Sequence, residues 1–359
     1  MKSILYLSPN HSTFVQKDIE ILSTEFKIKF FKHFYPGGIK QVSYLFLQPF
    51  RLLSDIGKID CMLIMFGGLW AFWPVLLGKL FGKPVAIILG GTDCVAFPHL
   101  NYGYFSKWYL KLILNFEYTY ADFLIPVHES LVYQSYSYDS QSKFTKQGYK
   151  AFLPKNRTPY QVVHNGYKEI ELNPNILKKD QFLSIIPAEK TNRAVLKGLP
   201  EIINLARDFG QYKFIVIGCK EEIINQFDIP INLEIIPFLP FEQLTNYFLE
   251  SRYYLQLSIS EGFPNSLCEA MMYECIPIGS RVGGVPAIID DAGVIISNKI
   301  QSEIHRAISY VLSVSEEKKQ LLGSNARKRI IENFPLHLRQ QKLISILNQL
   351  IQKNQLLNH

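Results

Sequence analysis

The stretch Ser258–Pro286, SISEGFPNSLCEAMMYECIPIGSRVGGVP, decides how the rest of this chain is interpreted. Leu255–Ser260 has the composition of the end of a buried strand, Glu261–Pro264 that of a tight turn, and Asn265–Tyr273 that of a helix. Proline fits the first turn of a helix because its missing N–H costs nothing there. The stretch therefore predicts a strand, a turn and a helix in immediate succession.

This turn and helix start predict an anion site. The free backbone amides of a helix N-terminus, together with the helix dipole, attract negative charge, and Gly262 allows a bulky ligand to approach the backbone. Glu261 and Glu269 flank the site with acceptors for hydroxyl groups. Such a site suits a sugar nucleotide, with its pyrophosphate on the amides. The residues assigned to donor binding here are Gly262, Phe263, Pro264, Asn265, Ser266, Leu267 and Glu269.

The string as a whole carries a family resemblance. Glu261-Gly-Phe-Pro, Glu269-Ala, a short strand at Ile276–Ile278 and the turn Gly283–Pro286 together resemble the donor-site signature of retaining family 4 glycosyltransferases. The Glu that usually follows the last turn is Ala287 here. The resemblance implies an α/β protein with the GT-B fold, in which two Rossmann-like domains with parallel sheets face each other across a cleft.

A second cluster, Arg193-Ala-Val-Leu-Lys197-Gly198, supplies cations. Two cations next to a diphosphate stabilise the charge that grows on it as it leaves. Family 4 enzymes carry an Arg and a Lys-Gly in this region, so the resemblance assigns Arg193 and Lys197 to catalysis and Gly198 to donor binding. The spacing is shorter than is common, and a solvated basic helix start is the alternative. By the same resemblance, Phe238 and Leu239 occupy the nucleobase-binding loop, unless Pro237–Pro240 is only a turn.

In the first half the resemblance is looser. Gly90-Gly91-Thr92-Asp93 lies where many relatives keep a His that approaches the transferred sugar. Asp93 is a catalytic candidate there, with a loop-capping role as the equal alternative, and Gly90, Gly91, Thr92 and Asn165 form the expected acceptor side. His11 replaces part of a glycine pair and is a speculative contact. His128 and His164 are interpreted as structural.

Composition sets broader limits. With 48% hydrophobic and 19% charged residues, the chain is globular with large cores. The net charge of +7 lies in residues 1–180, which hold 20 Lys and Arg against 13 Asp and Glu. That excess favours an anionic partner, with a merely solvated lysine-rich surface as the alternative. Five scattered cysteines without a CxxC pair predict neither disulfides nor a zinc site and indicate a reducing compartment.

Alternating short apolar and amphipathic runs predict βα units in both halves. We expect an acceptor-binding domain at 1–170, a linker at 171–180, a donor-binding domain at 181–335 and a C-terminal helix at 336–359 that packs back on the first domain. The uncharged stretch Cys61–Gly78 predicts a strand, a glycine turn and a buried helix rather than a membrane span. The predicted strands are Ser3–Ser8, Phe26–Phe31, Cys61–Phe66, Val85–Leu89, Phe123–Val127, Gln161–His164, Phe182–Ile186, Lys213–Gly218, Leu233–Ile236, Tyr254–Leu257, Ile276–Ile278 and Val294–Ile296.

Eight aromatic residues with Lys107 and Lys111 lie between Tyr102 and Tyr120. At helical spacing a core role is favoured, but aromatic residues beside lysines are also typical of a bilayer interface. Peripheral contact with an anionic membrane is therefore a second hypothesis.

The leading interpretation is a glycosyltransferase that moves a sugar, with retention, from a nucleotide donor to a glycan or lipid-linked acceptor. The expected setting is bacterial cell-surface polysaccharide synthesis in the cytoplasm, at the inner face of the membrane. The donor is UDP- or GDP-linked, and neither metal, cofactor nor nucleic acid is expected. Alternatives are a GT-B sugar-nucleotide epimerase and a non-catalytic sugar-nucleotide binder. An oxidoreductase is disfavoured because the chain has no GxGxxG. The catalytic candidates are Glu261, Arg193, Lys197 and Asp93.

Overall fold

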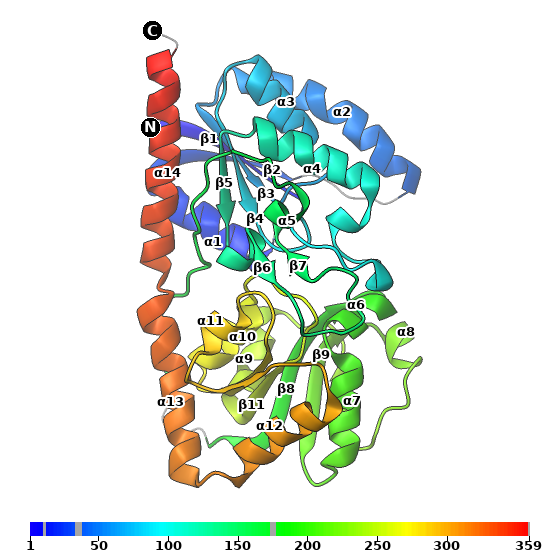
Figure 1. The fold of residues 1–359 in the computed structure, drawn as a ribbon. Helices are drawn as coiled ribbons and strands as arrows, with labels where there is room; N and C mark the ends of the chain where they lie inside the picture. Colours follow the sequence, from blue (N-terminus) through cyan, green and yellow to red (C-terminus); the bar gives the residue numbers. More distant parts are fainter. Residues whose placement is uncertain (10–11, 33–37, 173–176, 358–359) are drawn as a thin grey trace.

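The protein folds into two α/β domains that meet at their loops (Figure 1). The computed structural model describes residues 1–9, 12–32, 38–172 and 177–357. The fold class predicted from the sequence, two domains with parallel sheets and a helical C-terminus, is confirmed. His11 and part of the predicted linker, residues 173–176, lie outside the described residues.

The first domain contains a five-stranded parallel sheet in the order β2-β1-β3-β4-β5. The central strands β3 and β4 are buried along their whole length, as expected for a sheet covered by helices on both faces. The strands are β1 Lys2–Ser8, β2 Phe26–Lys32, β3 Cys61–Met65, β4 Val85–Leu89 and β5 Phe123–Pro126, with a small antiparallel pair of β6 Gln134–Ser135 and β7 Lys146–Gln147. The helices are α1 Thr13–Leu22, α2 Gly38–Ile56, α3 Phe72–Leu80, α4 Trp108–Tyr120 and α5 Tyr149–Phe152, with 3₁₀ turns at Pro98–Leu100, Tyr104–Ser106 and Glu129–Leu131.

The second domain contains a six-stranded parallel sheet in the order β10-β9-β8-β11-β12-β13. Its first strand begins at Lys179, two residues before the predicted boundary, because the polar residues Lys179 and Asp180 extend an apolar strand. The strands are β8 Lys179–Ala188, β9 Lys213–Cys219, β10 Leu233–Ile236, β11 Ser251–Gln256, β12 Ile276–Ser280 and β13 Val294–Ile296. The helices are α6 Thr191–Leu196, α7 Leu199–Asp208, α8 Glu221–Ile224, α9 Phe241–Glu250, α10 Asn265–Met272, α11 Val285–Ile289, α12 Gln301–Ser313, α13 Glu316–Asn333 and α14 Leu336–Leu357.

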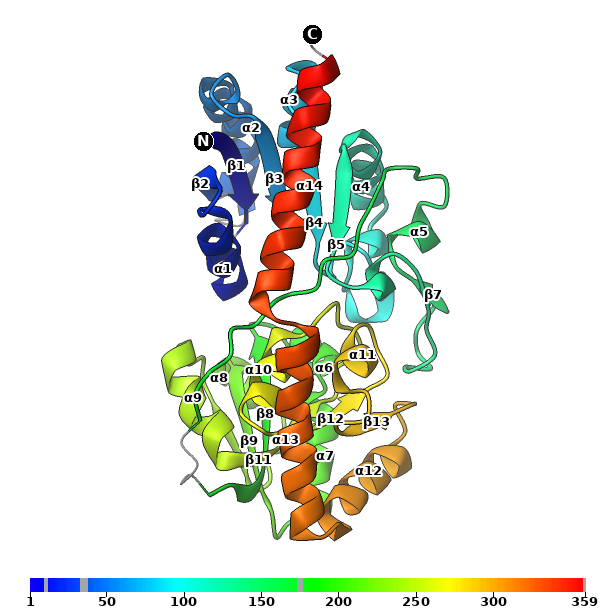
Figure 2. The ribbon, with the colours of Figure 1, turned by 90° about the vertical axis from the view of Figure 1, so that its left-hand side faces the viewer.

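The last two helices run end to end along both domains (Figures 1 and 2). Helix α13 packs on the second domain and α14 on the first. Arg339 of α14 is buried and forms a bidentate ion pair with Asp18 of α1, at 2.6 and 2.7 Å. Where α13 gives way to α14, Tyr167 exchanges two backbone hydrogen bonds with Phe334 and Leu336. The chain therefore crosses between the domains twice, at adjacent points.

One predicted strand is wrong. Gln161–His164 forms no regular strand, although Gln161 and Val163 donate backbone hydrogen bonds to Leu124 and Pro126 of β5. Both residues pair on one side only, so the segment lies along the edge of the sheet without extending its ladder.

Candidate active site

A pocket of about 710 Å³ lies between the two domains, at the carboxyl ends of the strands. This is where open α/β sheets place their ligands. From the first domain four aromatic side chains, Phe14, Phe66, Trp70 and Tyr104, line it, and from the second domain Glu189 and Arg193 do so. The pocket thus presents an aromatic wall opposite one acidic and one basic residue.

Lys197 and Glu261 form an ion pair beside this cleft. Lys197 caps the end of α6, and its Nζ lies 2.5 Å from a carboxylate oxygen of Glu261, in the loop after β11. The two side chains are only 14% and 9% exposed. The same carboxylate oxygen accepts a hydrogen bond of 2.9 Å from Gln256, the last residue of β11. Two donors therefore fix Glu261, and the pair joins the two sequence clusters that predicted the site.

Arg193 reaches across the cleft. Its guanidinium stands over the ring of Tyr102, 5.0 Å from the ring centroid, in a cation–π contact. The Tyr102 hydroxyl in turn is 3.0 Å from the hydroxyl of Thr92, a predicted acceptor-side residue. Arg193 is therefore held on one side by the first domain and faces the pocket on the other. Asn192, next to it, donates to the Leu100 carbonyl and fixes the same junction.

The predicted turn at Gly262 makes the tightest contact between the domains. A Cβ on Gly262 would lie 2.3 Å from the carbonyl oxygen of Gly90, so only glycine fits there. Behind the turn, a Cβ on Gly283 would lie 1.9 Å from the Glu261 carbonyl, and Gly283 has a φ of 52°. Gly284 donates its backbone N–H to the Gly262 carbonyl at 2.8 Å. The glycine pair at 283–284 thus supports the turn from below.

Helix α10 begins at Asn265 with Pro264 as its N-cap residue, and no side chain caps its first-turn amides. The Asn265 side chain carbonyl accepts hydrogen bonds from Asn165 Nδ2 at 2.9 Å and from the Tyr167 hydroxyl at 2.6 Å. A predicted donor residue, Asn265, and a predicted acceptor residue, Asn165, are therefore bonded directly to each other. They join the domains beside the predicted anion site.

Glu269, one turn into α10, lies against the first domain with its side chain 13% exposed. Burial raises the pKa of Glu269 to about 7, and Lys17 of α1, 3.9 Å away, opposes that rise. The two residues and Asn165 line a small recess between α1, α10 and α14. Glu269 therefore lies against the first domain, separated from the Lys197–Glu261 pair by one turn of helix.

The raised pKa of Glu269 predicts a specific pH dependence of stability. Because the unfolded carboxyl loses its proton near pH 4.5 and the folded one only near 7, the free energy of unfolding falls as pH rises through this window. The fall from this group is at most about 3 kcal/mol. Chemical denaturation should show that the free energy of unfolding of the wild type falls relative to that of Glu269→Gln between pH 4.5 and 7. Above pH 7 the difference between the two free energies should stay constant. A constant difference across that window would contradict the burial of Glu269.

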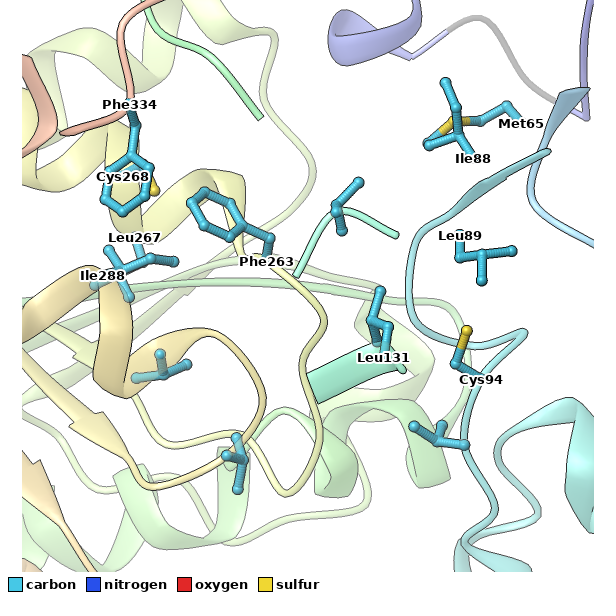
Figure 3. Close-up of a cluster of buried hydrophobic side chains, with 14 of the residues drawn as sticks. Met65, Ile88, Leu89, Cys94, Leu131, Phe263, Leu267, Cys268, Ile288 and Phe334 are labelled. Carbon is cyan, nitrogen blue, oxygen red and sulfur yellow. The ribbon is translucent and has the colours of Figure 1, made fainter. Parts of the chain in front are cut away.

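Two of the predicted donor residues have buried side chains. The side chains of Phe263 and Leu267 are 5% and 0% exposed, so they have no free surface for a donor. Phe263 stacks on His164 at 5.2 Å and meets Phe334 edge to face at 5.1 Å. Figure 3 shows Phe263 directed toward Phe334 and Cys268 of the second domain. Phe263 is thus an apolar anchor between the domains, and only the backbone of these two residues is available to a ligand.

Asp93 also has a structural environment. Its side chain is completely buried, and its carboxylate accepts backbone hydrogen bonds from Gly67, Gly90 and Gly91 and one from the Tyr118 hydroxyl. Burial raises the pKa of Asp93, and the backbone donors counteract this. The three backbone bonds organise the two glycine loops, and Asp93 itself lies among the residues that line the pocket. The geometry favours the loop-capping interpretation over the catalytic one.

Replacing Asp93 by asparagine tests that interpretation. The asparagine side chain would place its NH₂ group against backbone N–H or hydroxyl groups that are themselves donors. We therefore expect a loss of at least about 2 kcal/mol in the free energy of unfolding. Thermal and urea denaturation would measure it, with Asp228→Asn, a 93% exposed site, as the control. A variant of native stability that had lost its activity would assign Asp93 to the chemistry instead.

The remaining predicted residues lie at the same edge of the second sheet. Gly198 precedes α7, and its backbone packs against that of Leu257. Phe238 is 76% exposed in the loop after β10, and Leu239 beside it is half-buried. His128 is buried next to Phe263, and burial lowers the pKa of His128 to about 4, consistent with its structural interpretation.

Sequence reasoning missed several residues of the site. Tyr102 and Tyr104 were counted among the aromatic residues of a core helix, but they stand in the cleft. Gln256 gave a usable signal, since a polar residue at the end of a buried strand requires a partner. Phe66 gave none: its φ of 64° places its side chain over Gly90, and only the backbone shows that.

Comparison with known proteins agrees with the fold and with the family resemblance of the sequence. Residues 176–329 match the family model of the glycosyl transferases group 1. A trehalose synthase of Thermococcus litoralis is 34% identical over 96 residues, which cover 26% of this chain and 23% of that protein, so the match spans less than a quarter of the relative. Sucrose-phosphate synthase from Thermosynechococcus elongatus superposes with a TM-score of 0.76 at 12% identity, over 98% of this chain and all of the other. Anabaena HepE in complex with UDP and glucose gives 0.71 at 12% identity, over 97% and 100%.

The two structural matches extend over both domains and the C-terminal helix, and the family match covers the donor-site signature. The whole chain has the GT-B fold, and residues 176–329, which form most of its second domain, match the family model of the glycosyl transferases group 1.

Proposed function

We propose that this protein is a retaining glycosyltransferase that takes a sugar from a nucleotide donor and passes it to a glycan or lipid-linked acceptor. The observation that carries the proposal is the Lys197–Glu261 ion pair, together with Arg193, which interacts electrostatically with Glu261 and lines the interdomain pocket. The ion pair and the donor-site signature at 258–286 both lie within residues 176–329, the part of the chain that matches the family model. The proposed setting is the synthesis of bacterial cell-surface polysaccharide.

In the proposed reaction, the bond between the anomeric carbon and the diphosphate oxygen breaks, and the acceptor oxygen bonds to the same face of that carbon. Arg193, Lys197 and the first amides of α10 stabilise the negative charge that develops on the leaving diphosphate. The acceptor hydroxyl gives its proton to a diphosphate oxygen, so no protein base is required. Glu261 holds Lys197 in place, and its carboxylate is proposed to accept hydrogen bonds from hydroxyl groups of the donor sugar. The proposed reaction uses no metal ion.

The aromatic wall of the first domain supports an acceptor site there. Phe14, Phe66, Trp70 and Tyr104 offer flat apolar surfaces, which suit the apolar faces of sugar rings. The proposed compartment is the cytoplasm, at the inner face of the membrane. All five cysteines are free and buried, in keeping with a reducing environment.

Thermal-shift measurements with a panel of nucleotide sugars test the proposal. HepE has been crystallised with UDP and glucose, so UDP-glucose is the first donor to try, followed by GDP-linked sugars. A donor at a hundred times its dissociation constant should add about 2.7 kcal/mol of stability. Glu261→Gln should reduce the shift. Absence of any saturable shift across the panel would refute the assignment, and turnover of the donor without an acceptor would point to an epimerase.

A further inference from the structure

We propose that the outer face of helices α2, α3 and α4 rests on an anionic lipid bilayer and presents the first domain to an acceptor held in that membrane. The lipid contact stands independently of the proposed function, and only the identity of the acceptor rests on it. The three helices lie together on the face of the first sheet opposite α14, with α3 packed between α2 and α4 (Figures 1 and 2).

Helix α2 carries an exposed apolar stripe. Phe46, Phe50 and Leu53 recur at the four- and three-residue spacing of one helix face, and Leu47 adjoins them. Phe50 is 71% exposed. Since the opposite side of the helix buries Leu52 and Ile56, this stripe is a second apolar face and is not required by the core.

Exposed apolar side chains also occur on the neighbouring helices α3 and α4. Trp108, Tyr109 and Leu112 of α4 are exposed, with Trp108 at 76%, and Leu80 and Phe81 are exposed at the end of α3. Apart from Phe238 and Phe241, every exposed Phe or Trp among the described side chains lies on this face. Such a concentration marks an interaction surface rather than scattered apolar residues.

The charges of this face select the partner. Arg51, Lys79, Lys107 and Lys111 are exposed on or next to these helices. Bulky apolar and aromatic side chains set among lysine and arginine are the composition with which proteins enter the headgroup region of anionic membranes.

Acidic residues are absent from the exposed part of this face. Among the described side chains of the three helices, the acidic ones are Asp55 and Glu117, and both are buried. Asp55 pairs with Lys29, and Glu117 accepts the backbone N–H of Gly68. The sign of the exposed charge is thus uniform, which favours a lipid surface over a protein partner of mixed charge.

The helices that form this face adjoin the segments that carry part of the aromatic wall of the pocket. Tyr104 lines the pocket and lies one turn before Trp108, with which α4 starts. On α2, Gln48 donates a hydrogen bond of 2.8 Å to the carbonyl of Trp70, which also lines the pocket. Contact with a membrane at Trp108 and Phe50 would therefore bring the acceptor side of the pocket close to the lipid headgroups. None of the described helices is long and apolar enough to cross a bilayer, so the contact is with one leaflet.

Co-sedimentation of the full chain with vesicles tests the proposal, with phosphatidylcholine alone compared with phosphatidylcholine containing phosphatidylglycerol. We expect binding only with the anionic lipid, weakened by salt. Lys111→Glu should reduce the partition coefficient by at least about fivefold, and Phe50→Glu and Leu112→Glu should reduce it further. The matched controls are Lys328→Glu and Leu321→Glu, at exposed positions of α13, which should bind as the wild type does.

Equal binding to both kinds of vesicle, no binding, or equal losses in the controls would overturn the proposal. Gel filtration of the same proteins tests whether a second copy of the chain, instead of a membrane, binds this face. A wild-type dimer that Phe50→Glu dissociates would show that it does. Donor-induced thermal shifts should be unchanged in all these variants, since none of the residues lies in the donor site. Vesicle binding by a protein that no nucleotide sugar stabilises would refute the proposed function while leaving the lipid contact intact.

Discussion

Replacing Lys197 by alanine is expected to lower kcat/KM for sugar transfer by at least about a hundredfold, the usual cost of removing one preorganised group that stabilises transition-state charge. Lys197 is a cation beside the predicted diphosphate site, and it also holds Glu261 in place. Glu261→Ala should have an effect of similar size because it removes the partner of Lys197 and the acceptor for sugar hydroxyls. Initial rates measured at several donor concentrations, with product analysis, would give the loss.

A stability measurement must accompany these rates. Breaking a buried ion pair from one side costs about 3–5 kcal/mol at the buried limit, and this pair is almost buried. Glu261→Gln is the conservative variant, because its amide oxygen still accepts the hydrogen bond from Gln256. Lys213→Ala, an exposed lysine that pairs with Glu234, is the matched control and should keep its activity. Full activity in Glu261→Ala or Lys197→Ala would overturn the site assignment.

Adding one methyl group at Gly262 is expected to disturb the contact between the domains. The new Cβ would lie 2.3 Å from the Gly90 carbonyl oxygen, so the turn or the facing loop must shift. Overpacking of this kind typically costs about 1–3 kcal/mol. Because the shifted turn also carries Glu261, we expect Gly262→Ala to lose most of its activity. Denaturation curves and transfer rates would measure the two effects, and small-angle scattering would show whether the domains separate.

Gly57→Ala is the matched control for this substitution, since no atom lies within 4 Å of a Cβ built there. It should be at least as stable as the wild type, because alanine restricts the unfolded chain more than glycine does. Native activity and unchanged scattering in Gly262→Ala would mean that the two loops do not approach each other in solution as closely as they do here.

The strands of both sheets could be predicted because each is a short apolar run bounded by turns, and β4, β10 and β13 even have the predicted ends. The segment after Gln161 failed for a physical reason. Its two valines have the composition of a strand, and Gln161 and Val163 do bond to β5, but only an isolated bridge between Leu124 and Tyr160 joins the two segments, so no regular ladder forms. Whether an apolar run joins a sheet depends on the partner that the fold places beside it, and local composition does not contain that information.

The same limit applies to the site. The Lys197–Glu261 pair could be anticipated because both residues belong to motifs with a chemical role. The role of Phe263 could not, because the motif that contains it says nothing of the rings of His164 and Phe334 that bury it. For Asp93 the sequence offered two roles, and only the four donors around its carboxylate distinguish between them.

The pairing of Arg339 with Asp18 has a consequence for the order in which the chain folds during synthesis. The first domain precedes the second in the chain, yet one face of it is completed by α14, which is synthesised after the strands of the second domain. Until that helix arrives, Asp18 lacks the cation that it faces in the finished protein, and α1 has no cover. The second domain, whose strands and α13 are contiguous in the chain, can form earlier. The domain that is translated first is therefore the last to be completed, and only after the second domain has emerged.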